Sequence, residues 1–385
     1  MRIIFHHRIR SRDGQYVHLR EMLEAFSAIG NEVTLVGPRI KDDTAFGHGG
    51  SAISWVRSHL PKWFGEIVEL CYGVWAAVRL LMFVKSYRPD FVYERFNLFA
   101  PAGVLVCRLL RVPIVMEINA PLYEERLANG GLALKKLARW SQSLSWRWAT
   151  LCCPVSQVLA NSVMATGVPA ERVLVRHNGI DPERYHPGID RESAKNALGL
   201  SGKCVLGFIG FLREWHRVDR VIEVFATTDL PPEAHLLIAG DGPALPDLRN
   251  LCRELQVEDR VTFLGLVHWR DVPEVLAAFD IALQPAVTAY ASPLKLIEYL
   301  ACGLPVVAPA QENIQELIEH GRNGWILEDS SVKGLGLALR RLCSDSELRA
   351  RLGNAAALTI QERELTWTAN ARAVVAKISA DAGAQ

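Results

Sequence analysis

A lysine and a glutamate three residues apart, Lys295 and Glu298, are the pair whose spacing points most directly to chemistry. They fall in SPLKLIEYLACGLPVVAPA, residues 292–310. Ser292 and Pro293 are typical of a helix start, and apolar residues then recur at helical spacing. Lys295 would therefore lie in the first turn, where the helix dipole disfavours a cation by about 0.3–1 kcal/mol. A lysine beside the free N–H groups of a helix start indicates a bound anion such as phosphate; the alternative is a solvated Lys–Glu pair.

Other kinds of reactive site have little support in the sequence. The eight cysteines are scattered through apolar runs without a CxxC pair, which favours buried free thiols in a reducing compartment over a zinc site. No D-x-D sequence occurs, which agrees with chemistry that needs no metal. The first loop, RIRSRDGQ, lacks GxGxxG, which disfavours a dehydrogenase.

Length and charge set the broad class. A chain of 385 residues, half of them apolar, predicts a globular protein of two domains. Residues 1–175 carry 21 Lys and Arg against 14 Asp and Glu, whereas the remainder carries 22 against 28. A basic, Trp-rich first half suits an anionic surface or substrate. Because no Lys/Arg-dense run or nucleic-acid motif is present, we expect no nucleic-acid partner.

The elements that must position Lys295 and Glu298 follow an alternating pattern. A strand at 2–6, a helix at 15–29 and a strand at 31–36 are typical of a doubly wound opening. Strand and helix signals continue to a predicted strand at 173–176. After a Pro- and Gly-rich junction at 177–188 they restart, which predicts a second parallel sheet. The predicted fold is α/β, with two doubly wound Rossmann-like domains facing a cleft. We expect the domains at 1–180 and 181–365, and a C-terminal helix at 366–385 that returns to the first domain.

Two aromatic and basic stretches in the first half bear on membranes. The region 55–88 and the helix predicted at 134–148 both combine Trp with Lys or Arg, as interfacial helices do. Packing on the sheet is the alternative, favoured for 73–84 and left open for 134–148. The apolar stretch 72–84 holds Arg79 and is too short to span a bilayer. The opening MRIIFHH predicts a strand and no secretory signal, so we expect a cytoplasmic protein, with the inner membrane face as a further site.

Six short motifs in a fixed order then identify a family. DGQYVHLREM holds Gly14 and His18 of a GGxxxH loop, with Asp13 in place of the first glycine. The others are IGNEV, HNGID, IAGDGP, VTFLGLV and SPLKLIEYLACGLPVVAP. Together they resemble the retaining glycosyltransferases of family 4, which have the GT-B fold, over nearly the whole chain.

The resemblance implies a site for a nucleoside-diphosphate sugar. Glu298 would bind the ribose hydroxyls, since a carboxylate accepts two hydrogen bonds from a vicinal diol. Arg213, His216 and Lys295 would supply charge to the diphosphate without a metal or cofactor. The other implied donor-binding residues are Gly14, Gly210, Gly240, Gly242, Val267, Tyr290, Ser292, Pro293 and Leu294. The acceptor-side residues are Asn119 and His18; a general base is unassigned, with His6, His7 and His18 as candidates that also suit structural roles.

The chain departs from the family pattern at two places. The first glutamate of the E-x7-E pair, which faces the donor sugar in the family, is replaced by Tyr290. The Arg and Lys that grip the diphosphate correspond to Phe211 and His216 in GFIGFLREWHRVD. Arg213 is expected to replace the missing charge, whereas Arg217 is expected to be a solvated surface residue.

The expected activity is transfer of a sugar to an acceptor hydroxyl with retention, in cell-surface polysaccharide or glycolipid assembly. The implied partners are the nucleotide-sugar donor and a carbohydrate or lipid-linked acceptor, with peripheral membrane contact through the basic Trp-rich helices. A nucleotide-sugar 2-epimerase of the same fold would instead convert the donor without an acceptor. A non-catalytic nucleotide-sugar-binding subunit would bind without any transfer.

Overall fold

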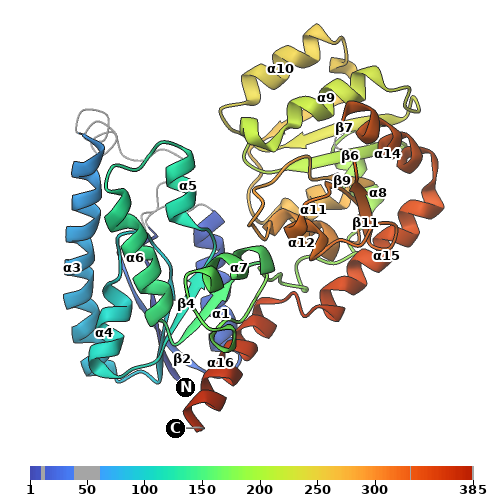
Figure 1. Cartoon of the computed structure of the whole chain (residues 1–385). Coiled ribbons are helices and arrows are strands. Elements are labelled where there is room, and N and C mark those ends of the chain that lie inside the picture. The colour runs from blue at the N-terminus through green and yellow to red at the C-terminus, as the bar shows by residue number, and fades with distance from the viewer. Residues whose placement is uncertain (10–13, 39–60, 330, 384–385) are drawn as a thin grey trace. The chain divides into compact units, whose positions relative to one another are not determined.

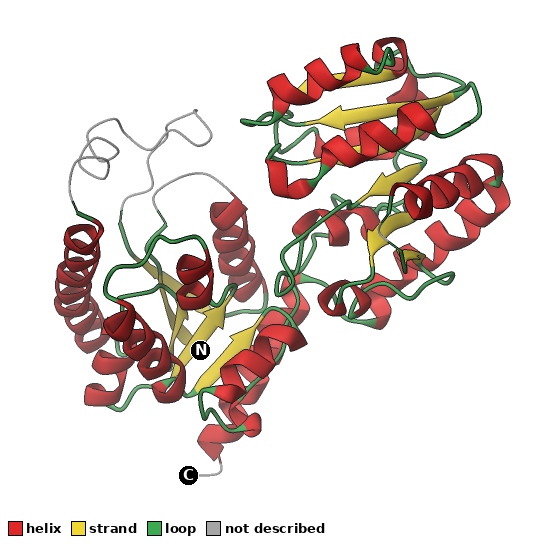
Figure 2. Ribbon diagram, turned by 45° about the horizontal axis from the view of Figure 1, so that its top comes forward, coloured by secondary structure: helices red, strands yellow, loops and turns green. Residues whose placement is uncertain are grey.

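The computed structural model describes residues 1–9, 14–38, 61–329 and 331–383, which form two compact units (Figure 1). Unit 1 consists of Met1–His177 together with Trp367–Gln385, and unit 2 of Asn178–Thr366. Each unit is a parallel sheet covered by helices on both faces (Figure 2). Parallel strands need crossover helices, so this layering follows from the alternating sequence pattern.

Unit 1 has a sheet of five strands in the order β2-β1-β3-β4-β5. The strands are β1 (Arg2–His6), β2 (Glu32–Val36), β3 (Phe91–Arg95), β4 (Ile114–Ile118) and β5 (Leu151–Pro154). The helices are α1 (Gly14–Ala28), α3 (Lys62–Tyr87), α4 (Ala102–Leu110), α5 (Leu122–Ala128), α6 (Lys135–Trp148), α7 (Gln157–Ala165), the short η1 (Ala170–Arg172) and α16 (Trp367–Gly383). In the sheet, Ile4 pairs with Thr34 on one side and Val92 on the other.

Unit 2 has a sheet of six strands in the order β11-β10-β9-β6-β7-β8. The strands are β6 (Cys204–Ile209), β7 (Ala234–Ala239), β8 (Val261–Gly265), β9 (Ile281–Leu283), β10 (Val306–Pro309) and β11 (Gly324–Leu327). The helices are α8 (Arg191–Ala197), η2 (Glu214–His216), α9 (Val218–Thr227), α10 (Leu245–Glu254), η3 (Glu258–Arg260), α11 (Val272–Ala277), α12 (Leu294–Ala301), α13 (Glu312–Gln315), α14 (Val332–Ser344) and α15 (Ser346–Glu362).

The core of unit 2 lies on both faces of its sheet. Alternate residues of β6 serve the two faces, with Leu206 and Phe208 on one and Val205 and Ile209 on the other. Both faces are apolar because a parallel sheet is buried on each side. Tyr299 of α12 is fully buried, and its hydroxyl accepts a hydrogen bond from the Ile209 N–H. This contact fixes α12 against the end of β6.

The predicted fold class is confirmed, including the returning C-terminal helix. α16 packs on α1, where the rings of Trp367 and His18 meet edge-on at 4.7 Å. The strand predicted at 173–176 is wrong. Only an isolated bridge joins Val173 to Cys152, and the N–H groups of Leu174 and Arg176 donate to the carbonyl oxygens of Cys152 and Pro154.

The region 55–88 differs from the prediction in length. Residues 55–60 lie outside the described part, and α3 then runs for 26 residues without a break. Within the described residues it is the one helix long and apolar enough to cross a membrane by length and composition. The apolar helix is thus longer than the stretch at 72–84 that the sequence pattern indicated. Arg79 lies within the helix, and its guanidinium donates to the Gly37 carbonyl oxygen at 2.8 Å.

Candidate functional site

The start of α12 collects the residues that the sequence singled out. Pro293 is the residue before the helix, so Ser292 does not cap it as predicted. Instead the buried Ser292 hydroxyl accepts from the Asn178 N–H at 3.0 Å, and its carbonyl oxygen accepts from the Asn178 side-chain amide at 2.6 Å. The HNGID motif thus ties the loop before α12 in place. The first-turn N–H groups keep no side-chain cap among the described residues, as an anion site requires.

Lys295, the second residue of α12, points to the end of β6. Its Nζ is buried without a hydrogen-bond partner among the described residues and lies 4.1 Å from the centre of the Phe208 ring. A Cβ on Gly210 would come within 2.7 Å of this nitrogen. Burial lowers the pKa of Lys295 to about 7, although the Glu298 carboxylate acts in the opposite direction. A buried cation with no partner is costly, and a bound anion would satisfy it.

Glu298 is the partner of two residues outside α12. The nearby Tyr185 side chain and the positive charge of the Arg184 guanidinium both favour the ionised form of its carboxylate. Burial nevertheless raises the pKa of Glu298 above its ordinary value. Arg184 also lies 4.7 Å from the centre of the Trp269 ring and donates to the Trp269 carbonyl oxygen at 2.9 Å. Glu298 is therefore held from several sides rather than solvated on a helix surface.

Two glycines bring the strand ends of the second sheet close together. Gly240 has φ +136° and donates from its N–H to the Gly265 carbonyl oxygen at 2.7 Å. A Cβ there would lie 2.0 Å from the Gly210 carbonyl oxygen. At Gly242, with φ +155°, a Cβ would lie 2.2 Å from the Leu212 carbonyl oxygen. Only glycine permits this approach of backbone to backbone, so both glycines shape the carboxyl edge of the sheet.

Arg213 and His216 flank the short helix η2 but differ in character. The Arg213 guanidinium lies between aromatic rings, 4.8 Å from the centre of Phe211 and 4.7 Å from that of Trp215. Burial and the nearby charge of Lys295 lower the pKa of His216 to about 4. The unliganded imidazole is therefore neutral at pH 7, and the charge expected of His216 depends on an anion that raises its pKa. Arg217 pairs instead with Asp219, at 3.1 Å.

The remaining donor-side candidates of unit 2 border the same edge. Val267 follows β8 and packs against the core. Tyr290 lies in the loop before α12, and Leu294 is the first residue of that helix. The buried Asn313 holds this loop by donating to the carbonyl oxygens of Thr288 and Ala291. Tyr290, the residue at the position of the family's glutamate, thus lies in a loop that Asn313 holds in place.

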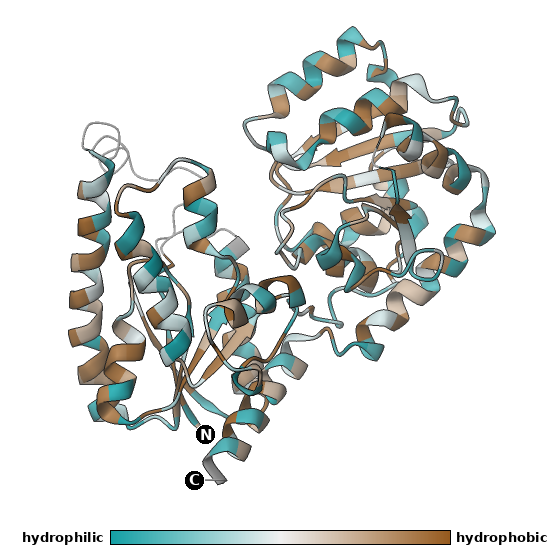
Figure 3. Cartoon of the chain, viewed as in Figure 1, coloured by the Kyte–Doolittle hydropathy of each residue, from teal (hydrophilic) through white to brown (hydrophobic). Residues whose placement is uncertain are grey.

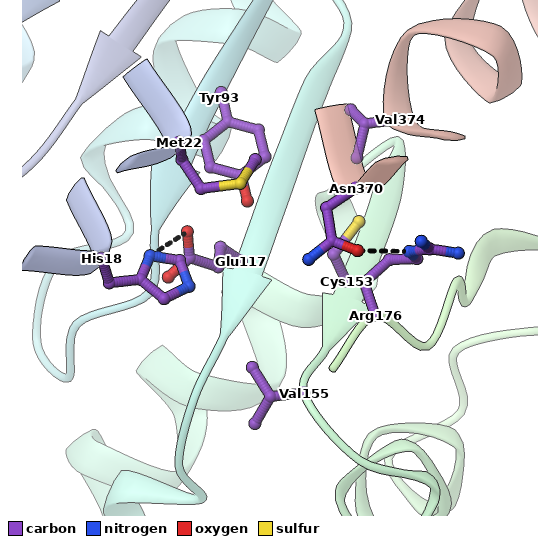
Figure 4. Close-up of a pocket in the computed structure, with 9 residues that line it drawn as sticks. All are labelled: His18, Met22, Tyr93, Glu117, Cys153, Val155, Arg176, Asn370 and Val374. Atoms are coloured by element: carbon purple, nitrogen blue, oxygen red, sulfur yellow. Dashed lines mark hydrogen bonds and ion pairs between the residues drawn. The ribbon is translucent and has the colours of Figure 1, made fainter. Parts of the chain in front are cut away.

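The candidates of unit 1, which are Gly14 for the donor and His18 and Asn119 for the acceptor, lie at the carboxyl edge of the first sheet. Gly14 opens α1, which holds His18, and Asn119 comes directly after β4. His18, Tyr93 and Glu117 line a small cavity with Arg176 and Asn370, and Figure 4 shows His18 and Glu117 facing each other. The His18 Nδ1 and a Glu117 oxygen are 3.5 Å apart. At about 10 Å³ the cavity has room for one water molecule and none for a sugar.

Glu117 was not predicted as a site residue, but it organises this edge. It pairs with Arg95 at 2.9 Å and accepts a short hydrogen bond from the Asn119 side-chain amide. Burial favours a raised pKa, but His18 and Arg95 outweigh it and hold the pKa of Glu117 below its ordinary value. Because Glu117 is buried, it positions Asn119.

His6 and His7 fit the structural alternative. The His6 Nδ1 lies 2.5 Å from the Glu94 carboxylate, and both side chains are buried. His7 accepts from the Ile9 N–H, and burial with the adjacent His6 lowers its pKa to about 4. A Cβ on Gly37 would collide with the His7 ring, so this imidazole is enclosed.

Comparison with known protein families decides the identity of the chain. Residues 12–184 match the family described as Glycosyltransferase Family 4, and residues 190–359 match the one described as Glycosyl transferases group 1. The chain belongs to the family 4 glycosyltransferases. The junction between the two matches falls within residues 185–189, just after the HNGID motif.

Several curated members of the family are similar to this family 4 chain. The N-acetyl-alpha-D-glucosaminyl L-malate synthase of Bacillus anthracis is 31% identical over 210 residues, covering 54% of each protein. The putative colanic acid biosynthesis glycosyltransferase WcaL of Escherichia coli is 26% identical, over 65% of this chain and 60% of WcaL. The matched regions thus span between half and two thirds of these relatives' lengths.

Solved structures show that this family 4 chain has the GT-B fold. Anabaena Alr3699/HepE in complex with UDP superposes with a TM-score of 0.77 at 21% identity, covering 99% of this chain and 100% of that one. WaaG, a glycosyltransferase involved in lipopolysaccharide biosynthesis, gives 0.68 at 19% identity, covering 97% and 99%. At these identities the likeness establishes the fold.

Sequence reasoning missed three residues that surround Lys295 and Glu298 in this family 4 chain. Tyr185 and Arg184 lie in the junction segment HNGIDPERYHPG, which was interpreted only as a domain boundary and a signature. Phe208, whose ring faces Lys295, was interpreted only as part of a strand. A polar aromatic just after a binding motif is a signal that could have identified Tyr185.

Proposed function

We propose that the protein is a retaining glycosyltransferase that moves a sugar from a nucleoside-diphosphate sugar to an acceptor hydroxyl. One observation carries the proposal. The Lys295 Nζ is buried beside Gly210 at the uncapped start of α12, with no hydrogen-bond partner among the described residues. A diphosphate between the helix N–H groups and this ammonium would satisfy both, and Glu298, three residues on, is spaced to take the ribose.

The proposed reaction exchanges one bond at the anomeric carbon for another. The bond from this carbon to the β-phosphate oxygen breaks, and the acceptor oxygen forms a new bond on the same face. The acceptor proton passes to the departing phosphate. The residues that would stabilise the leaving diphosphate are Lys295 and Arg213, with His216 once an anion raises its pKa. This role needs no metal and no further cofactor.

The acceptor is proposed as a carbohydrate or lipid-linked carbohydrate in the assembly of a cell-surface polysaccharide or glycolipid. Two similar proteins, WcaL and WaaG, are described as acting in colanic acid and lipopolysaccharide biosynthesis. UDP is the proposed first nucleotide to test, because HepE has been solved with UDP and with UDP-glucose. A lipid-linked acceptor would place the protein in the cytoplasm, at the inner membrane face.

A thermal-shift screen of nucleoside diphosphates and their sugars tests the donor, and product analysis with membrane extract tests transfer. We expect a shift with one nucleotide in wild type and a much smaller one in Lys295→Met or Glu298→Gln. Transfer by these two variants at the wild-type rate would refute the assignment. Conversion of the donor without an acceptor would indicate a 2-epimerase, and binding without any product would indicate a non-catalytic subunit.

A further inference from the structure

Helix α3 has one packed face and one bare apolar face. Gly73, Ala76, Leu80 and Val84 are buried, and the helix packs through this side on α4. The opposite stripe stays exposed, with Val74 64%, Trp75 53%, Val78 54% and Met82 59% accessible. Towards the start of the helix the stripe continues through Trp63, Phe64, Ile67 and Val68. Figure 3 shows hydrophobic residues along the length of α3.

This stripe is too apolar for an ordinary solvent face. Exposed residues at i, i+3, i+4 and i+7 are polar in a soluble amphipathic helix. Of the 18 consecutive residues that form the most apolar part of α3, only 22% are buried. A run of adjacent exposed apolar side chains along one helix marks an interaction surface.

The acidic side chains of α3 point away from its apolar stripe. Its two acidic residues, Glu66 and Glu69, turn away from the stripe, Glu66 to the backbone before α6 and Glu69 to Arg126 at 2.9 Å. Lys85, near the end of the helix, is exposed, and Lys62 at its start is exposed but donates to the Gly130 carbonyl oxygen at 2.8 Å. The basic helix α6 starts beside Glu66 and leaves Lys135 and Lys136 exposed, with its own buried face centred on Trp146. The exposed charges at the ends of α3 and at the start of α6 are thus lysines.

We infer that the outer face of α3 is a docking surface for an anionic lipid bilayer, with the helix lying in the interface. Tryptophans suit the headgroup level, the aliphatic side chains the acyl boundary, and flanking lysines the anionic headgroups. At 1.5 Å per residue the helix is about 39 Å long, so the stripe gives an extended contact.

The packed face of α3 requires that the helix lies on the membrane rather than across it. Glu66 accepts from the Ala133 N–H at 2.7 Å and from the Leu134 N–H at 2.6 Å, which anchors the start of α6. Arg79 and Lys62 donate to backbone carbonyl oxygens of unit 1. Insertion across a bilayer would break these bonds and strand a glutamate in hydrocarbon. An interfacial position keeps all of them.

Vesicle sedimentation with matched variants tests this surface. Wild type and Trp75→Glu/Val78→Glu are compared on phosphatidylcholine vesicles with and without one-third phosphatidylglycerol. The control, Leu337→Glu/Leu358→Glu, adds the same charges at exposed leucines of α14 and α15 in unit 2. We expect wild type and control to sediment with the anionic vesicles. The α3 variant should partition at least about tenfold less, because two apolar contacts become repelled charges.

Two results would overturn the inference. One is equal sedimentation of wild type and the α3 variant on anionic vesicles. The other is a wild type that stays in the supernatant and forms a dimer abolished by Trp75→Glu/Val78→Glu, since the stripe would then bind a second copy. Circular dichroism of the variant excludes misfolding, and nucleotide binding, a property of unit 2, gives an independent measure of the proposed function.

Discussion

The Tyr185 side chain lies close enough to the Glu298 carboxylate to favour its ionised form, which couples the segment after HNGID to the helix of the candidate donor site within unit 2. This interaction restricts the glutamate side chain before any ligand arrives. A glutamate oriented in advance loses less rotamer freedom when it takes up a diol. We therefore regard Tyr185 as a positioning residue for Glu298.

Substitution of Tyr185 by Phe should weaken UDP binding about fivefold, the equivalent of one hydrogen bond worth about 1 kcal/mol. The affinity for 2′,3′-dideoxy-UDP should not change, because that ligand has no diol for Glu298 to hold. Titration calorimetry of both ligands measures the difference. The control is Tyr299→Phe on α12, the helix that carries Glu298. This change leaves the Ile209 N–H unpaired and should lower the stability of the fold, but it should not alter the ratio of the two affinities.

Lys295→Met should stabilise the protein, most strongly at low pH. Below pH 7 the lysine is charged in the folded and the unfolded protein, so the folded state bears the full cost of the buried charge. Between pH 7 and its ordinary pKa of 10.5 only the unfolded state binds the proton, so wild-type stability rises with pH. Melting temperatures at about pH 6 and pH 9.5 should show a gain in the variant that shrinks with pH. A pH-independent difference would mean that Lys295 is solvated.

UDP affinity should fall as pH rises above about 7, because the diphosphate binds the protonated form of Lys295 and the free enzyme releases that proton near pH 7. The limiting slope is tenfold per pH unit. Titrations between about pH 7.5 and 9.5 avoid the phosphate's own ionisation. In Lys295→Met the weak residual affinity should be flat over this range, and a parallel slope in both proteins would assign the proton to another group.

Gly240→Ala should destabilise unit 2 by roughly 3 kcal/mol or more, because the new Cβ would lie 2.0 Å from the Gly210 carbonyl oxygen. Gly199→Ala is the matched control, since it also has a positive φ but open space around it. It should cost roughly 1–2 kcal/mol, the strain of a left-handed backbone alone. Urea unfolding followed by fluorescence compares them, and equal losses would show that the close approach is relaxed in solution.

Glu117→Gln should lower the stability of unit 1 at neutral pH, and this loss of stability should be smaller at acidic pH. His18 and Arg95 hold the pKa of Glu117 below its ordinary value, so its stabilising effect is present above about pH 4.3. That effect is lost as pH falls through the folded-state pKa. Melting curves at pH 7 and near pH 3.5 should show the variant approaching wild type. Glu171→Gln, at an exposed residue of η1, should show no loss at either pH.

The fold and the family could be predicted because they depend on local signals. Alternation of strands and helices, the glycines after β6 and β7, and the ordered motifs are all features of short segments. The place of Lys295 in the first turn of α12 was predictable for the same reason, from the helix-start residues just before it. These inferences needed no knowledge of which side chains meet in space.

Contacts between distant segments could not be predicted from the pattern. Nothing local indicates that Ser292 bonds to Asn178 rather than capping its helix, or that Tyr185 reaches Glu298. The neutral state of His216 likewise depends on burial and on Lys295 from another element. The length of α3 was underestimated because Arg79 interrupts its hydropathy, whereas the hydrogen bond that holds this guanidinium reaches the Gly37 carbonyl oxygen after β2.

The return of α16 to unit 1 has a consequence for the order in which the protein can fold during synthesis. Unit 2 is an insertion within unit 1, so every residue of unit 2 leaves the ribosome before Trp367 does. The first sheet must wait for the last helix to cover α1, whereas the second sheet can be completed while the chain is still growing. The two ends also meet, with the Ser379 hydroxyl 3.8 Å from the Met1 sulfur. A circular permutant that joins these ends and opens the chain at the unit boundary would make unit 1 contiguous and remove this delay.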